Sequence, residues 1–155
     1  GADMLTMHAV GGSAMMAAGH RGAEAAAFER KVPVPATLAI TVLTSMDAES
    51  LAATGVSRAL PEQVSSLAVQ AREAGLSGIV CSPQEASSMR ELLGPDAFIV
   101  TPGVRPAGSA KGDQSRVATP AQAFENGASH IVVGRPITQA EDPVAAFEAI
   151  AAELA

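Results

Sequence analysis

The sequence predicts an α/β protein in which strands of a parallel sheet alternate with helices. Five short, nearly continuous apolar runs are typical of strands buried on both faces, and they lie at 4–10, 37–44, 78–82, 97–103 and 130–134. Helical stretches separate these runs. Segment 13–31 is rich in alanine, and segment 61–75 has a proline in its first turn and ends on a glycine. This alternation indicates right-handed crossovers between parallel strands.

Later segments continue the same alternation. Further helices are predicted at 84–93, 119–128 and 142–154. Thr119 and Asp142 each precede a proline and are therefore natural N-caps. Asp47 and Glu49 indicate one more helix start, where carboxylates interact well with the helix dipole. We expect residues 1–155 to form a single domain.

The alternation alone fits two architectures, an open doubly wound sheet and a closed barrel. In both, ligands bind at the carboxyl ends of the strands. Two late runs, FIVTPGVRP (98–106) and HIVVGRPI (130–137), end in a glycine closely followed by an arginine. Because the loops after the last two strands of a barrel commonly form a phosphate site, these endings favour the barrel. The chain has 155 residues, which is fewer than the roughly 250 typical of an eight-stranded barrel.

The charge balance limits the possible partners. The net charge of −6 argues against binding to a nucleic-acid backbone. An anionic ligand must therefore be held locally by arginines and backbone amides. At the end of the last run, Gly134 allows backbone N–H groups to approach a phosphate, the following helix start adds further donors, and Arg135 supplies a planar, permanently charged group. The alternative is that Arg135 only pairs with a surface carboxylate.

Cysteine content and hydropathy point to the cytoplasm. The single cysteine, Cys81, excludes an internal disulfide, and no Cys/His cluster suggests a metal site. No apolar run approaches the ~20 residues needed to cross a bilayer. The first residues lack the charged region of a signal peptide. We therefore expect a cytoplasmic protein without a metal.

The connection between the fourth run and the helix at 119 is unusually long. It reads VRPAGSAKGDQSRVA (104–118), whereas most connections of this kind have about 2–6 residues. It contains several glycines, and Arg105, Lys111, Gln114 and Arg116 could contact phosphate or amide groups. Two interpretations remain open: a loop that closes over a ligand, or a solvated loop without a ligand.

The longest motifs carry a family resemblance. MHAVGG, AITVLTSM, GIVCSPQEA and VTPGVRPAGSAKGDQSRVATPAQAFENGASHIVVGRPITQAEDP resemble, in order and spacing, bacterial orotidine 5'-phosphate decarboxylase, over nearly the whole chain. The resemblance implies a (β/α)8 TIM barrel and a homodimer. It also implies a lyase that converts orotidine 5'-monophosphate to uridine 5'-monophosphate and CO2, the last step of de novo pyrimidine synthesis. The family uses no cofactor and no metal.

The resemblance also implies a set of substrate-binding residues. They are Thr44, Ser45, Arg105, Gln114, Gly134 and Arg135. By their match to the family's motifs, the first two are expected beside the pyrimidine, and the next two close over the phosphate and base. The last two are expected to clamp the phosphate.

The family's catalytic motif is absent. The family uses alternating lysines and aspartates, including an Asp-x-Lys-x-x-Asp motif on the third barrel strand, to destabilise the substrate carboxylate and to protonate C6. This motif does not occur here, and the two lysines, Lys31 and Lys111, lie at a helix end and in the long connection. We therefore expect no catalytic residue in this chain, which matches strands four to eight of the barrel.

Several alternatives follow from a partial barrel, because five strands leave two open sheet edges. The chain could be a fragment, or the first three strands could be supplied separately. The five strands could also rearrange into a doubly wound sheet, or pair edge to edge with a second copy. The functional alternatives are a non-catalytic nucleotide- or phosphate-binding half-barrel and a sugar-phosphate decarboxylase or aldolase of the same superfamily.

Overall fold

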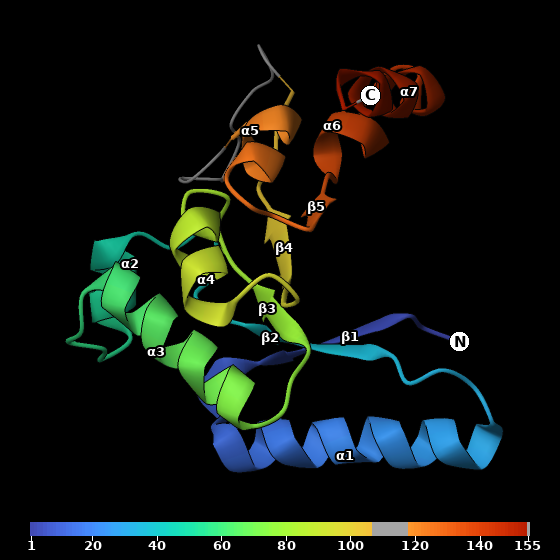
Figure 1. Cartoon of the computed structure of the whole chain (residues 1–155). Helices are drawn as coiled ribbons and strands as arrows, with labels where there is room; N and C mark the ends of the chain where they lie inside the picture. Colours follow the sequence, from blue (N-terminus) through green and yellow to red (C-terminus); the bar gives the residue numbers. More distant parts are fainter. Residues whose placement is uncertain (107–117, 155) are drawn as a thin grey trace.

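A five-stranded parallel sheet forms the centre of the computed structural model, which describes residues 1–106 and 118–154 (Figure 1). Its strands are β1 (Met4–His8), β2 (Ala36–Ile40), β3 (Gly78–Val80), β4 (Phe98–Pro102) and β5 (His130–Val132). The strands lie in the order β1-β2-β3-β4-β5, so each pairs with its neighbour along the chain. A doubly wound sheet reverses its strand order at a switch point. The sequential order is that of a barrel and excludes the doubly wound alternative.

The helices follow the predicted pattern. They are α1 (Ser13–Arg30), α2 (Ala48–Ala53), α3 (Leu60–Glu73), α4 (Ala86–Leu93), α5 (Pro120–Glu125), α6 (Arg135–Thr138) and α7 (Pro143–Glu153), with a 3-10 turn at Ala9–Gly11. Both predicted N-caps before proline are confirmed: Thr119 forms a capping box with Gln122, and Asp142 Oδ1 accepts from two backbone amides. Asp47 caps α2, accepting from the Ser50 amide at 2.8 Å. Helix α5 ends earlier than predicted, and Gly127 has a φ of +93° two residues later.

The strands are shorter than the apolar runs that predicted them. The run 37–44 was expected to be extended throughout, but β2 ends at Ile40. The Thr41 amide still donates to the Val80 carbonyl oxygen at 3.1 Å, and the chain then turns, with the Met46 amide donating to Leu43 at 2.9 Å. Since β3 has only three residues, the hydrogen-bonded ladder between β2 and β3 ends where β3 ends. Hydrophobic content alone does not mark that point.

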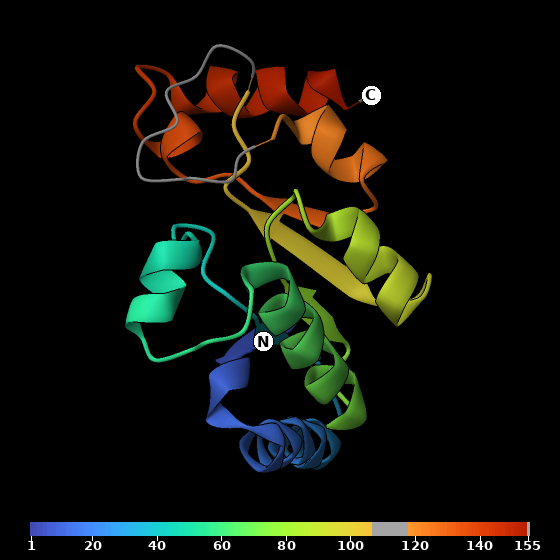
Figure 2. The same cartoon turned by 90° about the vertical axis from the view of Figure 1, so that its left-hand side faces the viewer.

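The two faces of the sheet differ in burial. The register places Met7, Ala39, Ile79 and Ile99 in one row, and the last three are completely buried in a core that includes Met16 of α1. Figure 2 shows α3 and α4 in front of this face. The opposite face carries the row His8, Ile40, Val80, Val100 and His130, which is exposed at both ends. Helices cover one face only, as they cover only the outside of a barrel.

A smaller apolar cluster lies at the β5 side of the sheet. Val104, Ala123 and Ala128 are buried there, with Ile131 and Val133 packed against them. No helix within 1–106 or 118–154 is both long and apolar enough to cross a membrane.

Candidate functional site

The carboxyl ends of the strands meet at one edge of the sheet, and polar side chains are buried around it. Those buried after the ends of β2, β3 and β4 are Thr41, Thr44, Ser82, Glu85 and Arg105. Buried polar groups cost free energy unless they are hydrogen-bonded, so they are retained where structure or function needs them. This edge is where parallel α/β proteins bind their ligands.

The turn after β3 is held by a reciprocal pair of hydrogen bonds. The Ser82 amide donates to Glu85 Oε2 at 2.9 Å, and the Glu85 amide donates to the Ser82 carbonyl oxygen at the same distance. The Gln84 amide also donates to Ser82 Oγ at 3.2 Å. Sequence reasoning did not select these residues, although the polar stretch directly after an apolar run was the available signal. Cys81, just before the turn, is fully buried, as expected of a small apolar residue.

Thr44 and Ser45 are adjacent in the turn after β2 but differ in exposure. Thr44 is only 8% exposed, whereas Ser45 faces solvent. Nearby, Thr41 Oγ1 donates to the Val80 carbonyl oxygen at 2.9 Å, which joins the ends of β2 and β3. Both expected base-site residues therefore lie at the carboxyl edge, and Thr44 is the one that is packed into it.

Arg105 lies against the end of β4 and does not extend into solvent. Gly103 has a φ of +81°, which favours glycine and turns the chain after the strand. The backbone amide of Arg105 donates to the Ala118 carbonyl oxygen at 2.9 Å, and Nη1 of the Arg105 side chain donates to the Val104 carbonyl oxygen at 2.8 Å. The residue is only 9% exposed. A permanent positive charge is thus held at this edge. The expected loop partners, Gln114 above all, lie outside the described residues.

Gly134 and Arg135 follow β5, where α6 begins. Among the described residues, a Cβ added to Gly134 would meet no atom within 4 Å, so their packing does not require glycine there. Helix α6 is a single turn. Its Pro136 has no N–H, and the amides of Ile137 and Thr138 donate to the Gly134 carbonyl oxygen at 2.9 and 3.0 Å. The helix start therefore offers fewer backbone donors than expected, and the exposed Arg135 side chain becomes the main candidate anion ligand.

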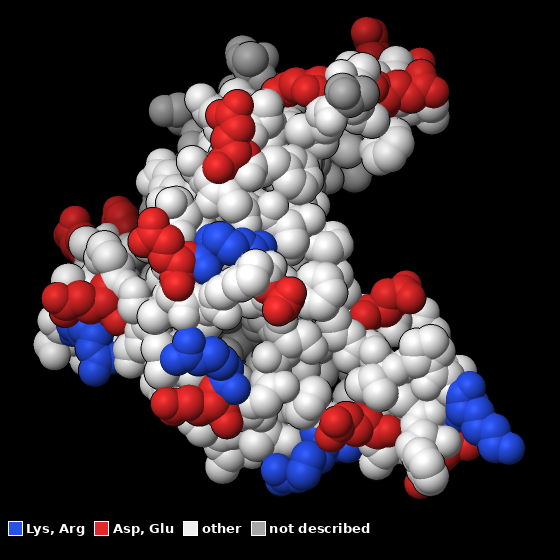
Figure 3. Space-filling model, in the orientation of Figure 1, with Lys and Arg blue, Asp and Glu red and all other residues white. Residues whose placement is uncertain are grey.

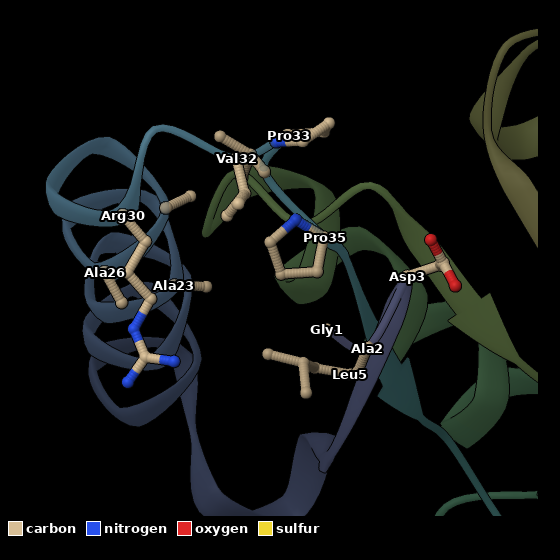
Figure 4. Close-up of a pocket in the computed structure, with 12 residues that line it drawn as sticks. Gly1, Ala2, Asp3, Leu5, Ala23, Ala26, Arg30, Val32, Pro33 and Pro35 are labelled. Carbon is tan, nitrogen blue, oxygen red and sulfur yellow. The ribbon is translucent and has the colours of Figure 1, made fainter.

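A cavity of about 410 Å³ lies away from this edge (Figure 4). It is lined by residues 1–3 and Leu5 at the start of β1, by the C-terminal half of α1, and by residues 32–35 in the connection that leads into β2. Its position at the N-terminal ends of the strands is the wrong side for a barrel's substrate site.

Sequentially ordered parallel strands, an outer helical layer and a polar carboxyl edge with two glycine–arginine endings define a βα-barrel-type protein. A family model described as "Orotidine 5'-phosphate decarboxylase / HUMPS family" matches residues 1–150. The chain belongs to this family.

Individual relatives agree over nearly the whole chain. Orotidine 5'-phosphate decarboxylase of Moorella thermoacetica is 56% identical over an alignment of 157 positions, which covers 99% of this chain and 62% of the relative. The protein of the same name from Thermobifida fusca is 51% identical, covering 97% of this chain and 60% of its own length. The crystal structure of the Lactobacillus acidophilus protein of that name superimposes with a TM-score of 0.79 at 42% identity, covering 97% of this chain and 62% of that one. The chain thus spans about three fifths of these proteins.

Proposed function

We propose that this chain is the phosphate- and base-binding part of an orotidine 5'-phosphate decarboxylase. The reaction breaks the C6–carboxylate bond of orotidine 5'-monophosphate, releases CO2, and adds a proton at C6 to give uridine 5'-monophosphate. The observation that carries the proposal is the 56% identity to a protein of that name over 99% of the chain. The buried polar edge supports it by supplying a suitable place for an anionic ligand.

Within this proposal, the carboxyl edge divides into a base side and a phosphate side. Thr44 and Ser45 contact the pyrimidine, and the burial of Thr44 suits a hydrogen bond made away from water. Gly134 and Arg135 hold the phosphate, since the open space at Gly134 allows close approach and a guanidinium binds two phosphate oxygens at once.

Loop closure completes the binding site in this proposal. Arg105 and Gln114, at the start and within the long connection, close over the phosphate and the base. Arg105 is already held at the carboxyl edge by its bonds to Val104 and Ala118.

The groups that act on the carboxylate come from outside this chain in our proposal. Lys31 follows α1 and precedes the N-terminal end of β2, so it lies at the opposite end of the sheet from Thr44 and Arg135. Lys111, the other lysine, belongs to the long connection, outside the described residues. A lysine and aspartates on a further barrel strand would destabilise the carboxylate and deliver the proton to C6.

The remaining expectations belong to the same proposal. We infer that residues 1–155 act as one domain and that the protein works as a cytoplasmic homodimer without metal or cofactor. Net charge −6 supports a small-molecule ligand over nucleic acid.

The test measures ligand binding and turnover separately. We expect isothermal calorimetry to detect uridine 5'-monophosphate binding to this chain, and ribose 5-phosphate to bind more weakly because it lacks the base contacts. Loss of orotidine 5'-monophosphate, followed by absorbance at high protein concentration, should be undetectable for the chain alone. Turnover by the chain alone would contradict the placement of the catalytic groups elsewhere. Equal affinity for the two ligands would contradict the base site and favour a sugar-phosphate enzyme.

A non-catalytic nucleotide-binding protein is the second candidate, favoured by the absent Asp-x-Lys-x-x-Asp motif. To separate the candidates, the turnover assay is repeated after adding the part of the Moorella thermoacetica protein that has no counterpart in this chain. Decarboxylation by the mixture supports the enzyme. Nucleotide binding without decarboxylation by a mixture shown to be assembled supports the second candidate.

A further inference from the structure

The chain that leaves β2 is joined to β3 through one residue, Thr41. The backbone amide and the side-chain Oγ1 of Thr41 both donate to the carbonyl oxygen of Val80, at 3.1 and 2.9 Å. A carbonyl oxygen has two lone pairs, so this pair of bonds uses both. Because Thr41 is buried, the two hydrogen bonds are shielded from water and are stronger than they would be on the surface.

The hydroxyl bond lies at the point where the backbone ladder between β2 and β3 stops. The register of the two strands ends at the pair Ile40 and Val80. In a parallel ladder the backbone groups of successive residues point alternately to the two sides, so Ser82 would be the next residue of this segment to face β2. The Ser82 amide instead donates to Glu85 Oε2 at 2.9 Å. The Thr41 hydroxyl therefore adds a side-chain link where backbone pairing no longer continues.

The turn that begins after Thr41 carries Thr44. Val42, at its start, is buried in the main core. The turn is closed by the Met46 amide, which donates to the Leu43 carbonyl oxygen at 2.9 Å. Thr44 lies inside this closed turn, so its position depends on how the chain leaves β2. That direction is set where the Thr41 bonds act.

We propose that Thr41 is a positioning residue for the base side of the ligand site. Its hydroxyl holds the start of the turn against β3 and thereby sets the place of Thr44 at the carboxyl edge. Thr41 is itself buried and bonded to Val80, so it acts through the backbone and does not touch the ligand. The inference rests on the function proposed above, in which Thr44 and Ser45 contact the pyrimidine.

A second buried threonine provides a matched control. Thr37 lies four residues before Thr41, near the N-terminal end of β2, and is completely buried. Its Oγ1 forms a hydrogen bond of 2.8 Å with Nδ1 of His20 in α1. Replacing either threonine by valine removes one buried hydroxyl and one side-chain hydrogen bond, but only Thr41→Val does so at the carboxyl edge. A general loss of stability therefore affects both variants, whereas a loss of positioning affects one.

The test uses two ligands that carry the same phosphate and differ in the base, uridine 5'-monophosphate and ribose 5-phosphate. The protein has a net charge of −6, and Figure 3 shows acidic side chains interspersed with basic ones over the face that it presents. The field of these charges acts alike on two ligands of equal charge. The difference in affinity between the two ligands therefore reports contacts with the base.

Isothermal calorimetry measures both affinities for the native chain and its variants. We expect Thr41→Val to weaken uridine 5'-monophosphate binding about 3- to 10-fold, the effect of one typical hydrogen bond. Ribose 5-phosphate binding should stay nearly unchanged, because the proposed phosphate contacts follow β5, and two strands separate β5 from β2. Thr41→Ser keeps the hydroxyl and should bind the nucleotide like the native chain, and so should Thr37→Val.

Hydrogen exchange tests the same link without a ligand. The Met46 amide, which closes the turn, should exchange faster in Thr41→Val than in the native chain and at the native rate in Thr37→Val. Circular dichroism checks that the variants are folded. Thr41→Ala, which also lacks the hydroxyl, takes the place of Thr41→Val if the valine variant does not fold.

The outcomes separate this inference from the proposed function. Nucleotide binding that the loss of the Thr41 hydroxyl leaves unchanged would overturn the inference alone. Equal weakening of both ligands would also overturn it, as would equal weakening of nucleotide binding by Thr41→Val and Thr37→Val, because the effect would then be general. Failure of the folded native chain to bind uridine 5'-monophosphate would overturn the proposed function, and this inference with it.

Discussion

Arg90 and Gly127 are 37 residues apart in the sequence, yet Nε and Nη2 of Arg90 both donate to the Gly127 carbonyl oxygen, at 3.1 and 3.0 Å. The third guanidinium nitrogen, Nη1, donates to the carbonyl oxygens of Gly94, Pro95 and Ala97 at 2.8 to 2.9 Å. One side chain thus joins the end of α4, the approach to β4 and the turn before β5.

Replacing Arg90 by lysine should lower the free energy of unfolding by about 2–3 kcal/mol, because an ammonium group cannot reproduce the planar set of donors. Urea denaturation followed by circular dichroism measures the loss. Arg21→Lys, on the exposed surface of α1, should have little effect. Equal stability of the two variants would show that the Arg90 network contributes little.

Gly78 is required because β3 and β4 approach closely at this position. A Cβ at residue 78 would overlap the carbonyl group of Phe98, its partner in the register. Gly78→Ala should therefore destabilise the protein by about 2–3 kcal/mol, as overpacking does. Gly22→Ala is the matched control, because a Cβ there meets nothing within 4 Å and lies in the middle of α1. It should raise the free energy of unfolding by about 0.5–1 kcal/mol. The same sign for both changes would contradict the proposed close approach.

The Asp47 cap should make stability depend on pH in the acid range. Hydrogen bonds from the backbone amide and hydroxyl of Ser50 hold the pKa of Asp47 below its ordinary value of 3.8. A carboxyl with a lowered folded-state pKa stabilises the fold fully above its unfolded-state pKa, and this contribution is lost as the pH falls through the folded-state value.

The pH effect is measured with two variants. Asp47→Asn keeps a capping oxygen but does not titrate, so its melting temperature should fall less than that of the native protein between pH 7 and pH 3. Asp47→Ala should be less stable than the native protein at pH 7, because the cap is lost. If native protein and Asp47→Asn lose the same number of degrees, the cap does not cause the pH dependence.

Arg135 should contribute strongly to phosphate binding. Arg135→Ala should weaken uridine 5'-monophosphate binding by about 1.5–3 kcal/mol, which is roughly 10- to 150-fold, the range for a hydrogen bond to a charged group. Affinity for uridine, which has no phosphate, should stay the same. Isothermal calorimetry measures both, with Arg21→Ala as the control for net charge. Unchanged nucleotide affinity would mean that Arg135 is only a surface charge.

Local patterns in the sequence determined much of this protein. Alternating apolar runs and helical stretches predicted each strand within residues 1–106 and 118–154 and the main helices there, because both signals depend on neighbours within a few residues. Thr119 and Asp142 marked helix starts for the same reason, since a cap bonds to amides two or three residues ahead. The glycine–arginine endings of two runs also pointed to the edge where Arg105 and Arg135 lie.

Only the tertiary structure decided the order of the strands, the residues at which they end and the contacts between distant segments. Sequential pairing excluded the doubly wound sheet, and the short β3 ended β2 at Ile40. The Arg90 network depends on how separate segments meet, because Arg90 and Gly127 are 37 residues apart in the chain. These features arise from contacts between residues far apart in the chain, and a local pattern carries no information about which distant residue will be the partner.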